Sequence, residues 1–176
     1  MLRKKIIKYA FFSLALGLVL LTSCQRDDIC PQSTVTTPQL RISFFDFEER
    51  DIPKPPANLR VKLSETDSIL LNRVNVADIR IPLKTNQNLT EYDFILNAAV
   101  LDSTGVDPTG NPDRLLFSYA RNEIYINRAC SYKVNYVDLN VDLQPEQDAD
   151  TFWIREINVA EETIENETNT HIFIYH

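Results

Sequence analysis

Acidic side chains supply the first candidate chemistry in this chain of 176 residues. Asp138, Asn140 and Asp142 alternate with apolar residues between positions 137 and 143, which predicts a strand with one solvated face. Side chains two positions apart on a strand are about 6.5–7 Å apart, a spacing that glycoside hydrolases use. The alternative is an ordinary solvent-facing strand. A looser set, Asp142, Glu146, Asp148 and Asp150, is a weak calcium candidate that lacks the form of a calcium-binding loop.

The two histidines and three cysteines form no recognisable metal or nucleophile motif. His171 and His176 are five positions apart, so on a strand they point to opposite faces and do not share a metal ion. We expect both at the surface or at a strand edge. There is no Gly-x-Ser-x-Gly motif, and three glycines are too few and too scattered for a phosphate loop. The sequence predicts no metal site and no cofactor.

Cys24 is the cysteine whose surroundings predict a modification. Four basic residues lie within the first eight positions, and an apolar run follows from Tyr9 to Leu21, which is short for a membrane span. The run ends in Leu-Thr-Ser-Cys24, which resembles the bacterial lipobox, where small residues admit the signal peptidase and the cysteine thiol is acylated. We predict a signal peptide over 1–23 and a bilayer anchor on Cys24. The alternative is an ordinary signal peptide followed by a chance cysteine.

The residues after Cys24 predict where the anchored chain is delivered. They are Gln25, Arg26, Asp27 and Asp28, and this order resembles the surface-export signal of Bacteroidota lipoproteins. We expect a lipid-anchored protein of the outer membrane, exposed at the cell surface. Two alternatives are the inner leaflet of that membrane and a charged linker without a sorting role.

Cys30 and Cys130 remain after Cys24 is assigned to the lipid. A lipoprotein beyond the inner membrane lies in an oxidising compartment, where two such cysteines usually pair. We predict a disulfide between them, with Cys30 in a tether and Cys130 at the end of a strand over 124–129. The alternative is two free thiols, with Cys130 buried as a small apolar residue.

The elements that position these residues are predicted to be strands. From Gln39 onward, apolar residues recur at alternate positions in eight to ten short runs separated by turn-forming clusters. The phase slips at Tyr136-Val137, which predicts a β-bulge. The nearest approach to a helical pattern, over 66–77, fits a strand pair equally well. We predict an all-β, antiparallel β-sandwich of immunoglobulin-like size over 39–176, after a polar tether over 24–38.

Composition excludes two broad classes. The net charge is −7, and the first 23 residues contain no acid, so the mature chain is more acidic still. Such a chain repels phosphates and is not expected to bind nucleic acid. Hydrophobic residues make up 44% of the chain, which is too many for a disordered protein.

Several short runs resemble a known family. They are Cys24-x-x-Asp-Asp-Ile-Cys30-Pro, Thr36-Thr-Pro-x-Leu40, Phe44-Phe-Asp46, Ile81-Pro-Leu-Lys-Thr85, Arg128-Ala-Cys130, Trp153-Ile154 and Asn166-Glu167. Together they are similar to a family of small Bacteroidota lipoproteins of unknown function. The resemblance implies a lipoprotein with a structural role for Cys30 and Cys130. It implies no catalytic or ligand-binding residues.

These observations predict a non-enzymatic binding or accessory module of the cell envelope. Its partners would be the bilayer, through Cys24, and an envelope protein or glycan. The alternative function is an envelope glycan hydrolase that uses paired acids such as Asp138 and Asp142.

Overall fold

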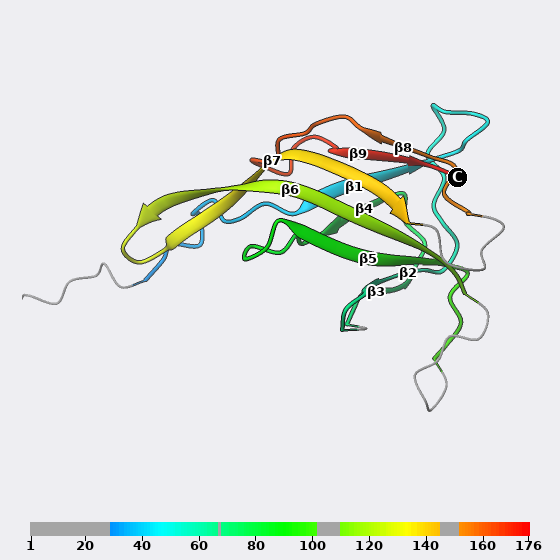
Figure 1. Ribbon diagram of the computed structural model, residues 1–176, viewed down its shortest axis with the longest axis horizontal. Coiled ribbons are helices and arrows are strands. Elements are labelled where there is room, and N and C mark those ends of the chain that lie inside the picture. Colours follow the sequence, from blue (N-terminus) through cyan, green and yellow to red (C-terminus); the bar gives the residue numbers. More distant parts are fainter. Residues whose placement is uncertain (1–28, 67, 102–109, 145–151) are drawn as a thin grey trace, which may run out of the picture. The chain divides into compact units, whose positions relative to one another are not determined.

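The structure is a computed structural model that describes residues 29–66, 68–101, 110–144 and 152–176. Within these ranges the chain forms nine strands and no helix (Figure 1). None of these residues belongs to a helix with the length and apolarity needed to span a bilayer. The strands in chain order are β1 (Leu40–Phe45), β2 (Leu59–Leu63), β3 (Ile69–Val74), β4 (Asp78–Ile81), β5 (Leu89–Leu96), β6 (Asn111–Asn127), β7 (Ser131–Gln144), β8 (Glu156–Val159) and β9 (Ile172–Tyr175).

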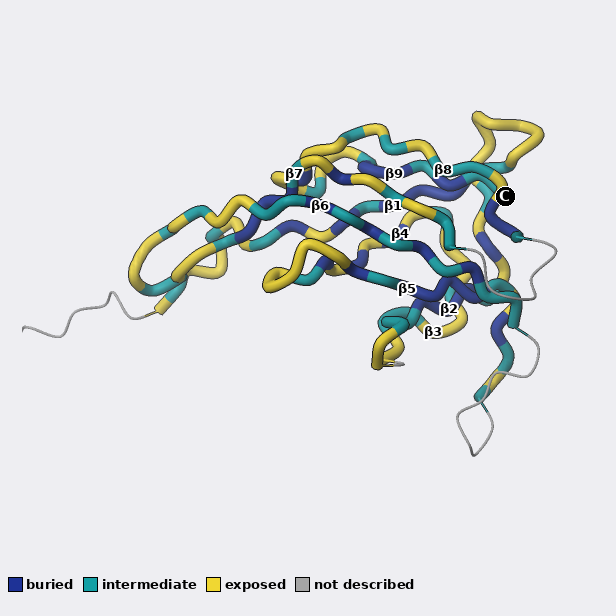
Figure 2. Tube along the Cα trace, viewed as in Figure 1, coloured by how far each residue is buried: buried dark blue, intermediate teal, exposed yellow. Residues whose placement is uncertain are grey.

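The strands form two sheets, as the predicted sandwich requires. One sheet has the order β4-β1-β9-β8, and the other has the order β3-β2-β5-β6-β7. The inward residues are those of the period-two pattern, because successive side chains on a strand point to opposite faces. Leu40, Ile42 and Phe44 of β1 are fully buried, as are Ile172 and Ile174 of β9. They pack in one cluster with buried residues of the five-stranded sheet, which form dark runs along the strands in Figure 2.

One strand pair departs from the predicted antiparallel pattern. β9 lies parallel to β1, with Ile42 opposite Ile172 and Phe44 opposite Ile174. Alternation of apolar residues does not encode strand direction, since both directions place the same residues inward. The C-terminal strand therefore occupies the middle of its sheet, between β1 and β8.

The predicted bulge in β7 is present. Burial follows Val134 and Tyr136 up to that point and then shifts to Leu139. The backbone N–H groups of Tyr136 and Leu139 donate to the carbonyls of Ile164 and Glu162, so three positions on β7 match two on the neighbouring segment, which is the count of a bulge. Asp138, between them, has a φ of 55°. The bulge lets both halves of a 14-residue strand direct apolar side chains to the same core.

Three tyrosines hold the passage from the four-stranded to the five-stranded sheet. The hydroxyl of Tyr119 donates to the Lys84 carbonyl at 2.9 Å, and that of Tyr136 donates to the Leu83 carbonyl at 2.9 Å. The hydroxyl of Tyr92 donates to the Pro82 carbonyl at 2.5 Å. Burial raises the pKa of Tyr136 to about 12 and also raises the pKa of the other two. We call these three residues the tyrosine clamp. Their hydroxyls bond the backbone carbonyls of residues 82–84, which follow the end of β4 where the chain crosses between the sheets.

The chain divides into two compact units. The larger comprises residues 35–125 and 132–176 and contains the sandwich. The smaller comprises residues 126–131 together with the chain up to Thr34, of which residues 29–34 are described.

Candidate functional site

The connection between β1 and β2 is a loop that its own side chains hold in shape. The Asp46 carboxylate accepts hydrogen bonds from the backbone N–H groups of Glu48 and Glu49, at 2.8 and 3.0 Å. The backbone N–H of Asp46 donates to the Ile52 carbonyl across the loop at 3.0 Å. Loops fixed on a rigid sheet are the usual carriers of binding residues.

Lys54 ties this loop to the C-terminus of the chain. Its Nζ lies 2.7 Å from the Asp46 carboxylate and donates to the His176 backbone oxygen at 2.8 Å. The Lys54 ammonium, followed by the N–H groups of Glu49 and Glu48, lowers the pKa of Asp46 to about 2. The carboxylate therefore stays charged, and the loop keeps its shape, over the whole physiological pH range.

The outward side of the loop combines apolar and acidic groups. Phe47 is 38% exposed and Ile52 is 50% exposed, both high values for large apolar side chains. Glu48 and Glu49 line a depression of about 510 Å³ beside Ile52 and Lys54. Because the Lys54 ammonium is held by Asp46, the charge left at the rim is negative. The loop therefore suits a partner that offers an apolar recess next to basic groups.

A ring of aromatic side chains supports the base of the loop. Phe45 of β1 packs against Phe173 and Tyr175 of β9, with ring centroids 5.6 and 6.0 Å apart. The Arg50 guanidinium lies 5.0 Å from the Tyr175 centroid and 5.7 Å from the Phe47 centroid. It also makes a bidentate ion pair with Glu156, which raises the pKa of Arg50 and lowers that of Glu156. This stack of cation and rings holds Phe47 in place.

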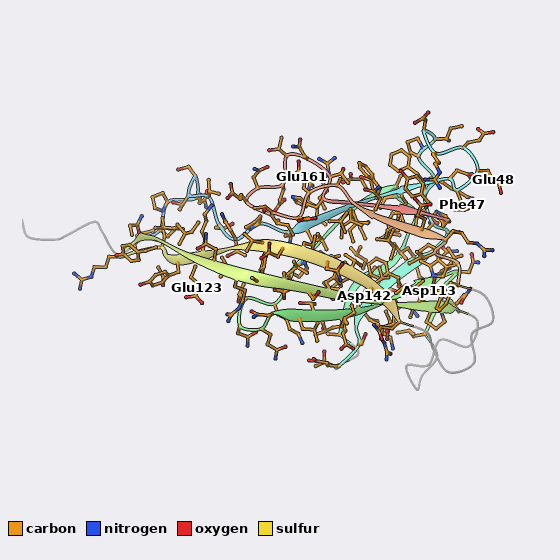
Figure 3. All side chains as sticks on the ribbon, turned by 45° about the horizontal axis from the view of Figure 1, so that its top comes forward. Phe47, Glu48, Asp113, Glu123, Asp142 and Glu161 are labelled. Carbon is orange, nitrogen blue, oxygen red and sulfur yellow. A yellow bond between two sulfur atoms is a disulfide. The ribbon has the colours of Figure 1, made fainter. Side chains whose placement is uncertain are left out.

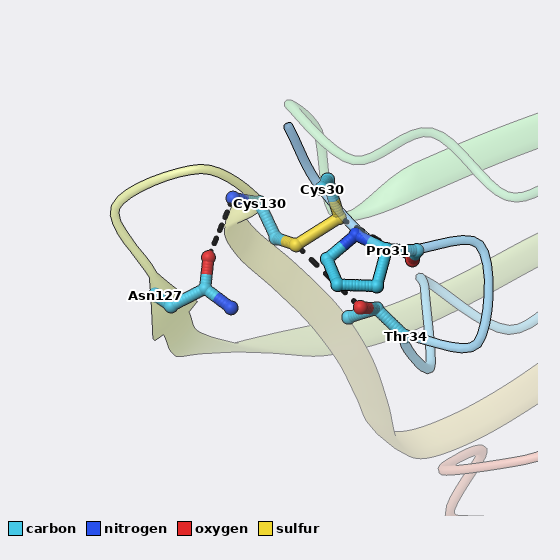
Figure 4. The surroundings of a disulfide bond; sticks show 5 residues. All are labelled: Cys30, Pro31, Thr34, Asn127 and Cys130. Atoms are coloured by element: carbon cyan, nitrogen blue, oxygen red, sulfur yellow. Dashed lines mark hydrogen bonds between the residues drawn. A yellow bond between two sulfur atoms is a disulfide. The ribbon is translucent and has the colours of Figure 1, made fainter. Parts of the chain in front are cut away.

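The predicted disulfide is present in the smaller unit. Cys30 and Cys130 are bonded, with their Cα atoms 4.8 Å apart (Figure 4). The Cys130 N–H donates to the Asn127 side-chain oxygen at 2.8 Å, and the Thr34 hydroxyl lies 3.6 Å from the Cys130 sulfur. The expected position of Cys130 at a strand end was wrong: β6 ends at Asn127, and Cys130 lies in the turn before β7. The alternation of apolar residues does not show where a strand ends and a turn begins, because a turn forms its hydrogen bonds locally.

The acidic residues of β7 lie on an exposed strand face. Asp138, Asn140 and Asp142 are all exposed, and the Asn140 amide donates to the Asp142 carboxylate at 3.1 Å. Asp138 and Asp142 are four positions apart, which on a strand corresponds to about 13 Å. That separation exceeds the usual distance between the two carboxylates of a glycosidase.

One of the two histidines, His171, differs from the expectation. His171 is only 1% exposed, so its predicted surface or edge position was wrong. Its Nδ1 accepts a hydrogen bond from the Arg41 N–H at 2.9 Å, and its Nε2 lies 3.0 Å from the Asn166 carbonyl oxygen. Only the neutral ring with a proton on Nε2 fits both contacts. Burial lowers the pKa of His171 and also that of His176.

Other predicted site residues lie outside the described ranges. They are Cys24, predicted to carry the lipid, the predicted export residues Gln25, Arg26, Asp27 and Asp28, and the calcium candidates Glu146, Asp148 and Asp150. Among the residues that are described, no three His, Cys, Asp or Glu side chains form a group that could hold a metal ion.

The β1–β2 loop was not recognised from the sequence as a candidate site. Its signal was the composition Asp-Phe-Glu-Glu-Arg-Asp-Ile between two predicted strands, where two large apolar residues flank four charged ones. Its partners Glu156, Tyr175 and His176 are more than a hundred positions away. Figure 3 shows Phe47 and Glu48 together at one end of the sandwich, with Glu123 on β6 at the other.

Comparison with known proteins identifies a family without assigning an activity. Residues 58–176 match DUF6452, described as a family of unknown function. The matched stretch runs from the start of β2 to the end of β9 and contains Cys130. No curated protein and no solved structure matches the chain. Since the match covers more than half of its residues, the chain belongs to the DUF6452 family of unknown function.

Proposed function

We propose that this protein is a lipid-anchored, non-enzymatic binding module of the bacterial outer membrane. The observation that carries the proposal is the β1–β2 loop, which displays Phe47 and Ile52 to solvent on a fixed backbone. An unsupported loop would lose conformational entropy on binding, whereas this one is already ordered. The lipobox at Cys24 supports the membrane anchor, and residues 25–28 support delivery to the cell surface.

The partner that fits the loop is an envelope protein with an apolar recess bordered by basic side chains. Phe47 would enter the recess, and Glu48 and Glu49 would face the basic border. Aromatic residues supported from below are frequent energetic centres of interfaces, because they bury much surface without losing many rotamers.

Photo-crosslinking in intact cells tests the binding site. A photoreactive amino acid at position 47 is expected to form a defined adduct with one envelope protein. The matched control places it at Asn158, an exposed residue of β8, where no such adduct is expected. The wild-type protein in excess should compete for the adduct, and Glu48→Lys/Glu49→Lys should compete several-fold less well. Equal adducts from both positions, or none from position 47, would refute the loop as a binding site.

Localisation is tested separately. Cys24→Ser is expected to move the protein from the membrane to the soluble fraction. Protease treatment of intact cells should cut the wild-type protein, and substitution of residues 25–28 by alanine should protect it. A wild-type protein that resists the protease while lysed cells are cut would place the module on the periplasmic side.

A further inference from the structure

The part of the β6–β7 hairpin that continues beyond β5 has surface chemistry different from the rest of the sandwich. The pairing of β6 with β5 ends at Ser118, opposite Leu89. The Tyr119 N–H still donates to the Asn88 carbonyl at 3.1 Å, and beyond it β7 is the neighbouring strand of β6 in the sheet. We call residues 120–125 and 132–133, which belong to the larger unit, the β6–β7 arm.

Two tyrosines on the arm are exposed and pack against each other. Tyr125 is 57% exposed and Tyr132 is 60% exposed, and their ring centroids are 5.2 Å apart in an edge-to-face arrangement. Neither belongs to the core cluster. A pair of large rings turned to solvent, rather than one scattered ring, is the kind of surface that contacts a partner.

The disulfide restricts how far this pair can lie from the lipid anchor. Cys24 precedes Cys30 by six positions, and Tyr132 follows Cys130 by two. An extended chain spans at most about 3.6 Å per residue, and the bonded cysteines add 4.8 Å between their Cα atoms. The Cα of Tyr132 is therefore within about 35 Å of the Cα of Cys24 in any conformation. Without the disulfide, the chain from Cys24 first meets β7, the strand of Tyr132, at Thr37, whose hydroxyl accepts a hydrogen bond from the Val134 N–H at 3.0 Å. The free segment between anchor and sandwich is then thirteen positions long instead of six.

The charges and rings of the arm suit the headgroup layer of a membrane. Tyrosine is enriched at membrane interfaces, where the ring contacts acyl chains and the hydroxyl meets water. Lys133 follows Tyr132 directly, and the one acid of the arm, Glu123, has the Arg121 guanidinium 3.7 Å away. The arm therefore does not present an uncompensated negative charge to lipid phosphates.

We infer that the β6–β7 arm is a membrane-contacting surface on which Tyr125 and Tyr132 enter the lipid headgroup interface. This inference rests on the proposed lipidation of Cys24. The acyl chains bring the protein to the bilayer, and the Cys30–Cys130 bond keeps Tyr132 within about 35 Å of the anchored residue. The β1–β2 loop lies at the opposite end of the sandwich (Figure 3), where it remains free to meet its partner. A second, weak contact of this kind restricts the orientation of an anchored protein.

Tryptophan fluorescence in vesicles tests the contact. The acylated protein is reconstituted in vesicles of phosphatidylethanolamine and phosphatidylglycerol that contain lipids brominated near the headgroup. The reporter variants are Tyr132→Trp and, as a matched control at the other end, Phe47→Trp. The single natural tryptophan, Trp153, is buried and gives the same background in both. We expect several-fold stronger quenching at position 132 than at position 47.

Removal of the disulfide provides the second part of the experiment. In Tyr132→Trp with Cys30→Ser and Cys130→Ser, or after mild reduction, quenching should be weaker than in Tyr132→Trp with the disulfide intact, because the free segment is longer. Equal quenching at positions 132 and 47 with the disulfide intact would overturn the inference, as would a protein adduct at position 132 in cells without vesicle quenching. Mass spectrometry of the same sample separates the two proposals: absence of acyl chains on Cys24 refutes the anchor, whereas acylated protein without quenching refutes only the membrane contact.

Discussion

At the scale of single residues, polar groups in this protein serve the fold where they are buried and are available for recognition where they are exposed. The tyrosine clamp and His171 belong to the first kind, since each forms a hydrogen bond with a backbone group. Phe47 and the arm tyrosines belong to the second kind.

Removal of one clamp hydroxyl should destabilise the protein. Tyr136→Phe leaves the Leu83 carbonyl without its 2.9 Å partner, and we expect the free energy of unfolding to fall by about 1 kcal/mol. Tyr125→Phe is the matched control, because that side chain is exposed, and its effect should stay within about 0.5 kcal/mol. Urea unfolding measures both. Equal stabilities of the two variants would contradict the role of the clamp.

His171 should make the fold sensitive to acid. Burial lowers the pKa of its ring in the folded state below the ordinary value of 6.5, so at mildly acidic pH the unfolded chain binds the proton more readily. The free energy of unfolding should therefore decrease as the pH falls below about 6.5. Urea unfolding at neutral and at mildly acidic pH measures this slope, which should be smaller in His171→Gln. An NMR titration that places the His171 pKa at or above 6.5 would exclude this explanation.

At the scale of elements, the position of β9 explains why the end of the chain is structural. β9 lies between β1 and β8, and its two inward isoleucines are fully buried. It also brings Tyr175 and His176 to the β1–β2 loop, where they contact Arg50 and Lys54. The last strand in the sequence therefore shapes the loop that follows the first strand.

A matched pair of alanine variants tests the central position of β9. Ile174→Ala removes a fully buried side chain and should lower the free energy of unfolding by about 2–5 kcal/mol, since it leaves a cavity in the core. Asn158→Ala, on the neighbouring strand β8, replaces an exposed side chain and should change it by no more than about 0.5 kcal/mol. A loss below 1 kcal/mol in Ile174→Ala, on the order of a surface change, would mean that β9 is not central to the sheet.

At the scale of the whole molecule, the disulfide joins positions 30 and 130, which are 100 residues apart in sequence. In the chain-entropy description, such a cross-link stabilises the folded protein by reducing the freedom of the unfolded chain. The stabilisation does not depend on how the smaller unit contacts the sandwich.

Loss of this bond should therefore affect global stability. Cys30→Ala/Cys130→Ala is expected to lower the free energy of unfolding by up to about 4–5 kcal/mol, and the wild type under reducing conditions should show a similar decrease. Cys24→Ser serves as the control, because it removes a cysteine without breaking the bond. Unfolding midpoints that are the same with and without the bond would show that the unfolded chain is not restricted by it.

The sequence alone determined the features that depend on local pattern. Period-two alternation predicted the all-β sandwich, the phase slip at Tyr136-Val137 predicted the bulge, and the cysteine count together with the expected oxidising compartment predicted the Cys30–Cys130 bond. These features can be read from the sequence because the burial of alternate residues leaves a local pattern, and the pairing of two cysteines depends on their number and on the redox state of the compartment.

Only the tertiary structure decided which distant residues meet. Alternation is the same for parallel and antiparallel neighbours, so it could not show that β9 pairs parallel with β1. It could not show that His171 is buried, because that burial depends on the Arg41 and Asn166 backbone groups folded around the ring. The candidate loop was hidden for the same reason: its shape depends on Glu156, Tyr175 and His176, which long-range packing brings to Arg50 and Lys54.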